Sequence, residues 1–162
     1  MQAKLLHEEY EDEFGESQRT FALIFDKGDE VITELKGFAK QYNLNGSHFT
    51  AVGAFQKATL GYFERQEMDY KHIPINEQVE VLIMAGDIVS SEDGHKVHAH
   101  VVVGKSDGSA HGGHILEAYV WPTLEVMMTE EPSYLRRKID DETGLALIDI
   151  QSKYDLEGKQ SS

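Results

Sequence analysis

The 162-residue sequence contains no cysteine, which excludes disulfide bonds and thiolate metal ligands. Any bound metal ion would have to be held by histidine, aspartate, glutamate or water. The sequence also has no apolar run near the roughly 20 residues that a membrane-spanning helix needs. Its start, Met1–Glu8, lacks the apolar core of a signal peptide. We therefore expect a cytoplasmic protein that has no membrane partner.

Positive charge is scarce, with 15 basic residues against 29 acidic ones and a formal net charge of −14. Most non-specific affinity for nucleic acids comes from cationic contacts with phosphates, so this composition disfavours direct nucleic-acid binding. The basic cluster at 136–138 is followed by acidic residues at 140–142. We interpret this cluster as a solvated charged turn.

The pattern of apolar residues predicts one helix and many strands. Between positions 30 and 42 the apolar residues share one helical face, with Asp29 as the expected N-cap and Asn43 to Gly46 as the stop. Strands are predicted at 20–25, 49–55, 58–63, 79–89, 97–104, 111–121, 124–128 and 145–150. Pro122 is expected to end the strand at 111–121. The expected fold is a single α+β domain in which a mostly antiparallel sheet packs against one main helix.

The two ends of the chain differ in character from its middle. Residues 1–17 are acidic and are expected to form a loose arm or an edge segment. Residues 18–150 are expected to form the domain, and residues 151–162 a polar C-terminal tail.

The most informative stretch contains His98 and His100, followed by a Gly-Gly-His sequence that ends at His114. Residues i and i+2 of a strand point to the same face, so His98 and His100 should lie side by side. A three-residue loop, Ser106–Gly108, would place His114 directly opposite His100, with Gly108 in the left-handed conformation that this loop needs. His111 would then face away.

The hairpin register and the role of the paired glycines each have an alternative interpretation. A two-residue turn on Asp107-Gly108 would place His114 opposite Val101, on the wrong face, unless a bulge at Gly112-Gly113 corrected the register. Those two glycines could instead allow a neighbouring chain or a ligand to approach the backbone closely. We favour the three-residue loop.

Three imidazoles with no cysteine resemble an open catalytic zinc site, with water as the fourth ligand, rather than a closed structural one. The alternative is a hydrogen-bonded patch of histidines without metal. If metal binds, Glu125 on the following strand could approach as a general base or orient a ring N–H. Strand parity places Glu117 on the opposite face.

These motifs resemble the plants-and-prokaryotes-conserved (PPC) domain family over roughly residues 18–130. The resemblance is carried, in chain order, by Phe21-Ala22-Leu23, residues 26–30, Ala51 to Phe55, Glu80 to Leu82, His98-Ala99-His100, Gly112-Gly113-His114 and Glu125. It implies an antiparallel α+β domain that assembles as a homotrimer. It also implies that His98, His100 and His114 hold a metal ion, with zinc the expected cofactor.

The resemblance leaves three classes of function. The first is a stand-alone PPC protein with a metal site and a small-molecule ligand, whose chemistry, if it is an enzyme, would be metal-assisted hydrolysis or lyase chemistry. The second is a DNA-binding or transcription-associated module acting through protein partners. Plant members carry a DNA-binding AT-hook that this sequence lacks, and Gln78 and Val79 replace an Arg-Phe pair of their partner-binding stretch. The third is a structural oligomer in which the histidines are incidental.

Overall fold

A computed structural model describes residues 1–11, 16–91, 94–131 and 135–150. The expected tail at 151–162 lies outside the described residues. The chain forms one helix within these ranges, α1 (Val31–Tyr42), and a nine-stranded sheet. The strands are β1 (Gln2–Glu11), β2 (Glu16–Phe25), β3 (Gly46–Glu64), β4 (Asp69–Ile75), β5 (Val79–Ser91), β6 (Gly94–Gly104), β7 (Ala110–Glu130), β8 (Arg136–Ile139) and β9 (Ala146–Asp149).

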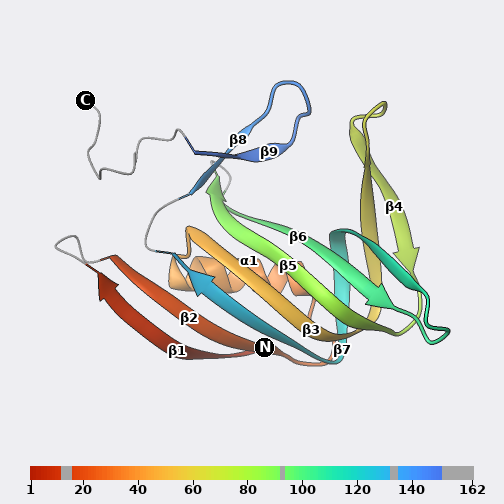
Figure 1. Cartoon of the computed structure of the whole chain (residues 1–162), viewed down its shortest axis with the longest axis horizontal. Helices are drawn as coiled ribbons and strands as arrows, with labels where there is room; N and C mark the ends of the chain where they lie inside the picture. The colour runs from red at the N-terminus through yellow and green to blue at the C-terminus, as the bar shows by residue number, and fades with distance from the viewer. Residues whose placement is uncertain (12–15, 92–93, 132–134, 151–162) are drawn as a thin grey trace.

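The main path through the sheet runs β1-β2-β7-β3-β5-β8-β9. Strand β4 pairs with β3, and β6 pairs with both β5 and β7. The sheet therefore curls until β6 meets the start of β7, while α1 packs across one face (Figure 1). The described strand pairs are antiparallel except for β5 and β8, which are joined in parallel at Ser90 and Arg136. This architecture confirms the predicted α+β class with a mostly antiparallel sheet.

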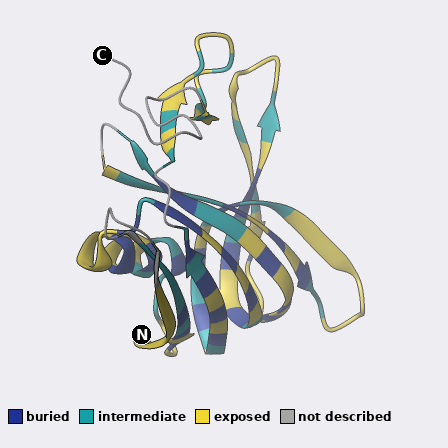
Figure 2. Ribbon diagram, turned by 60° about the vertical axis from the view of Figure 1, so that its left-hand side comes forward, coloured by how far each residue is buried: buried dark blue, intermediate teal, exposed yellow. Residues whose placement is uncertain are grey.

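The core lies between α1 and the sheet face that it covers. Buried and exposed positions alternate along the central strands (Figure 2), as expected for a sheet with one face in the core. The helix contributes Val31, Leu35, Phe38 and Ala39 to this core. The histidines described below lie on the opposite face.

Strands β3 and β7 are longer than predicted. Residues 49–55 and 58–63 are parts of the single strand β3, and 111–121 and 124–128 are parts of β7. The expectation that Pro122 ends a strand is wrong. The pairing of β3 with β7 changes register between Leu124 and Val120, so Pro122 lies in an irregularity where its missing N–H is tolerated.

The predicted helix N-cap is off by one residue. Glu30 is the cap, and its carboxylate accepts from the backbone N–H groups of Ile32 (3.3 Å) and Thr33 (2.7 Å). The Glu30 backbone is held extended by a bridge to Tyr119 of β7, which fixes the cap conformation there. Asp29 instead accepts from the N–H of Asp26. The predicted stop is confirmed by Asn43, which is left-handed at φ 52°.

The N-terminal segment takes one of its two expected forms, whereas two other segments depart from expectation. Residues 2–11 form the edge strand β1, paired with β2, which is the second of the two forms considered for the acidic N-terminal segment. Strand β4 was not predicted. The basic cluster at 136–138 is not a solvated turn, because it forms most of β8 and the Arg137 side chain is only 6% exposed.

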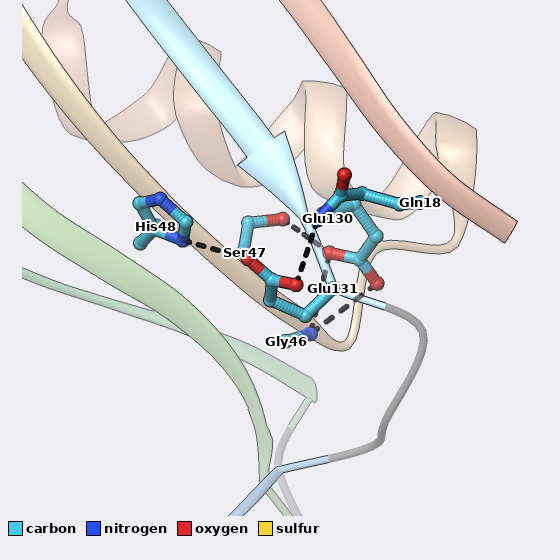
Figure 3. A network of polar contacts seen from close by, with 6 residues as sticks. All are labelled: Gln18, Gly46, Ser47, His48, Glu130 and Glu131. Atoms are coloured by element: carbon cyan, nitrogen blue, oxygen red, sulfur yellow. Dashed lines mark hydrogen bonds and ion pairs between the residues drawn. The ribbon is translucent and has the colours of Figure 1, made fainter. Parts of the chain in front are cut away.

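A buried carboxylate connects the end of β7 to the start of β3. Glu130 accepts from the backbone N–H of Asn45 (2.7 Å), the N–H of Gly46 (3.3 Å) and the hydroxyl of Ser47. Its neighbour Glu131 turns outward, toward Gln18 and His48 (Figure 3). The buried charge is therefore compensated by several donors.

The described helix α1 has 12 residues. No helix within the described ranges is long and apolar enough to cross a membrane.

Candidate metal centre

Three histidines meet on the face of the sheet opposite the core, two from β6 and one from β7. Ala99 between His98 and His100 is 1% exposed and belongs to the core. Strand alternation therefore turns both imidazoles to the opposite face, as predicted.

The β6–β7 hairpin supplies the third ring. The Lys105 N–H donates to the Ser109 carbonyl (2.8 Å) and the Gly108 N–H to the Lys105 carbonyl (2.9 Å). These bonds close a three-residue loop, in which Gly108 has φ 83°. His114 is consequently paired with His100. The favoured register is confirmed, and the two-residue turn is wrong.

The close approach that the paired glycines allow is made by the chain itself. A Cβ on Gly113 would lie 2.8 Å from the Gly61 carbonyl oxygen of β3. The pairing of β6 with β7 runs without a register shift through Gly112 and Gly113. Gly113 therefore accommodates β3 here, with no bulge between β6 and β7.

The three imidazoles converge. Their ring centroids are 5.2 Å apart for His98–His100, 5.3 Å for His98–His114 and 5.4 Å for His100–His114. One ring nitrogen of each lies within 4.8 Å of those of the others. Ligand nitrogens around tetrahedral zinc are about 3.4 Å apart, so these three nitrogens would move closer together on binding zinc.

The environment keeps two of the rings in the neutral form that a metal needs. Burial, and then the charges of His98, His100 and Arg137, lower the pKa of His114 to about 4. Burial and then His98 also lower the pKa of His100. The Nδ1 atom of His114 is buried and makes no hydrogen bond to any described residue. Two imidazoles with lowered pKa values, one of which has a buried unpartnered nitrogen, fit a transition metal ion together with His98.

Two further side chains contact these rings. Tyr70 of β4 stacks on His114, with centroids 4.8 Å apart and planes 24° from parallel. Asp87 of β5 lies opposite His98 in the strand register, and its Oδ2 atom is 3.6 Å from the His98 Nδ1 atom. The other carboxylate oxygen of Asp87 accepts from Arg137. Burial opposes ionisation of Asp87, but His98 and Arg137 outweigh it and lower its pKa.

Sequence reasoning missed Tyr70, Asp87 and Arg137. Asp87 follows Gly86 in the predicted long strand, and only the pairing of β5 with β6 places it beside His98. Tyr70 lies on the unpredicted strand β4, where its ring covers Gly61. No local pattern in the sequence marks either contact.

The acidic residue suggested for the site lies elsewhere. Glu125 is 11 residues from His114 on the same continuous strand, roughly 35 Å along it at about 3.3 Å per residue. The prediction that Glu125 approaches from a following strand is therefore wrong. Glu117 accepts from the Tyr119 hydroxyl. His111 pairs with Val103, on the face opposite to the cluster.

Comparison with known proteins identifies the family to which this chain belongs. The family model of the Plants and Prokaryotes Conserved (PCC) domain matches residues 12–132, so the chain belongs to this family, as the sequence motifs predicted. The match begins and ends earlier than the domain expected at 18–150. A comparison with curated proteins found no match.

Several solved structures are similar. A plant- and prokaryote-conserved protein from Pyrococcus horikoshii is 29% identical, with a TM-score of 0.76 over 81% of this chain and 91% of the other. A metal-containing protein from Archaeoglobus fulgidus is 27% identical, with a TM-score of 0.74 over 89% and 97%. A candidate DNA-binding protein from Bacteroides thetaiotaomicron is 25% identical, with a TM-score of 0.78 over 82% and 92%.

Proposed function

We propose that this protein binds a metal ion, with zinc the expected one, through His98, His100 and His114. The observation that carries the proposal is the convergence of three imidazoles, their ligand atoms within 4.8 Å of one another. The lowered pKa values of His100 and His114 favour the metal-binding form near neutral pH. The similar protein from Archaeoglobus fulgidus is described as metal-containing, which supports the same assignment.

Three protein ligands would leave a fourth coordination position for water or a small molecule. Zinc in such a site lowers the pKa of bound water to about 7. His100 is exposed, so solvent reaches this side of the cluster. The site therefore suits metal-assisted hydrolysis or lyase chemistry on a small molecule, in a cytoplasmic protein.

Metal analysis tests the proposal. The wild-type protein, purified without a histidine tag, should hold close to one equivalent of metal per chain. The variant His98→Ala/His100→Ala should lose it while the fold is retained, because the hairpin is supported by a larger sheet. His111→Ala is the matched control, since it removes an imidazole from the same hairpin but from the other face. Equal metal content in all three proteins would exclude the site.

The family resemblance also leads us to propose a homotrimer. Light scattering coupled to size-exclusion chromatography should then give three times the 18.3 kDa mass of the chain. A monomer at micromolar concentration would contradict this assembly.

DNA binding is the second candidate, favoured by the description of the Bacteroides protein. The net charge of −14 opposes direct binding. In gel shifts with duplex DNA at low salt we expect no complex. A complex that weakens steeply as salt rises would instead support this second function.

A further inference from the structure

A chain of contacts leads from the histidine cluster to the C-terminal hairpin. Asp87 divides its two carboxylate oxygens between two partners. Oδ2 faces the Nδ1 atom of His98 at 3.6 Å, and Oδ1 accepts from the Nη2 atom of Arg137. Asp87 is itself largely buried, with 24% of its side chain exposed.

Arg137 is anchored on its other side. Its Nη1 atom donates to the Ala146 carbonyl of β9 (2.7 Å), and its side chain is 6% exposed. Strand β8, which carries Arg137, is attached to β5 through the pair Ser90–Arg136, three residues along β5 from Asp87. A guanidinium fixed at both ends can restrict the carboxylate to one orientation.

The position of Arg137 in the chain separates it from the family domain. The family model ends at residue 132, and the β8–β9 hairpin follows it (Figure 1). A segment beyond the matched domain therefore reaches back to the histidine that β6 presents.

We propose that Arg137, acting through Asp87, is a positioning residue that orients the His98 imidazole toward the other two histidines. This inference rests on the proposed metal site. A carboxylate that contacts the outer N–H of a ligating histidine fixes the ring and its tautomer, leaving the other nitrogen for the metal. The β8–β9 hairpin is then part of the metal centre, although it supplies no ligand.

The test uses Co²⁺ as the probe on the full chain, with affinity measured by chelator competition and visible absorption. Asp87→Asn should weaken Co²⁺ binding about tenfold, the lower end of the range for such outer contacts. Arg137→Met should weaken it less, and the double variant should bind no more weakly than Asp87→Asn, because Arg137 acts through Asp87. Lys138→Met, which removes an exposed cation from the same strand, should match the wild type.

Thermal melting of the metal-free proteins separates orientation from folding. A purely structural role for Arg137 would lower the melting temperature but leave the Co²⁺ affinity of the folded protein unchanged, and that result would overturn the inference. If Arg137→Met does not fold, Arg137→Lys, which keeps the charge but loses the fork that joins Asp87 to Ala146, takes its place and should also weaken Co²⁺ binding. A wild-type protein that binds no Co²⁺ would exclude the metal site itself, whereas wild-type binding with unaffected variants would exclude only the positioning role.

Discussion

At the scale of single residues, the surroundings of His114 decide its protonation state. Tyr70 covers one side of the ring, and β3 lies against the neighbouring Gly113. A charged imidazole is poorly solvated in such a place, which is why the pKa of His114 falls to about 4. The same burial that hinders protonation leaves a neutral nitrogen available to a metal.

This environment predicts how the stability of the metal-free protein depends on pH. Unfolded His114 has an ordinary pKa of about 6.5, so between pH 6.5 and 4 the unfolded chain binds a proton that the folded chain does not. The free energy of unfolding must then fall as the pH drops through this window. In chelator-treated protein, the melting temperature of His114→Gln should fall less over this range than that of the wild type. Parallel curves would contradict the assignment.

At the scale of elements, the β6–β7 hairpin determines whether a three-histidine site exists. A shift of one residue in a hairpin moves every later side chain to the other face, so the loop length decides where His114 points. Gly108 takes φ 83° in this loop and has no atom near its virtual Cβ. Glycine is therefore favoured there by the backbone conformation alone, because a Cβ at this position would clash with no neighbouring atom.

We therefore predict opposite effects for two glycine substitutions. Gly108→Ala should destabilise the protein by about 1 kcal/mol, since a left-handed conformation costs other residues roughly this amount. Gly37→Ala, at an exposed position inside α1 that is equally free of contacts, should stabilise it by about 0.5–1 kcal/mol. Urea unfolding measures both. Equal changes in the free energy of unfolding would mean that backbone conformation does not control these sites.

At the scale of the whole molecule, the ends of β3 and β7 depend on contacts between residues far apart in the sequence. Glu130 accepts hydrogen bonds from Asn45, Gly46 and Ser47. If the carboxylate were removed, the Gly46 N–H and the Ser47 hydroxyl would be left without partners in a buried position. Each such loss costs about 1–3 kcal/mol.

Glu130→Ala should accordingly lower the free energy of unfolding by about 2–4 kcal/mol. Glu131→Ala is the matched control, because the polar contacts of its side chain among the described residues are with Gln18 and His48 and it is 41% exposed. Its loss should cost less than about 1 kcal/mol. Chemical denaturation followed by circular dichroism compares the two variants, and similar losses would contradict the role assigned to Glu130.

Much of the fold could be predicted because its signals are local. The apolar period of 31–42 specifies α1, and alternation along the strands specifies their core faces. The sequence-based predictions were wrong where pairing with a neighbouring strand overrides a local signal. Pro122 lies in a continuous β7 because the pairing with β3 is already irregular there, and Glu30 replaces Asp29 as the cap because β7 holds its backbone.

By itself, the sequence determined the α+β class through the periodicity of its apolar residues and the family through its motifs. Spacing along one strand and one short loop also favoured the hairpin register that brings the three histidines together. Only the tertiary structure decided what surrounds the rings. Tyr70, Asp87 and Arg137 come from β4, β5 and β8, and their positions depend on the pairing of distant strands. That pairing reflects packing over the whole sheet, which no short stretch of sequence encodes.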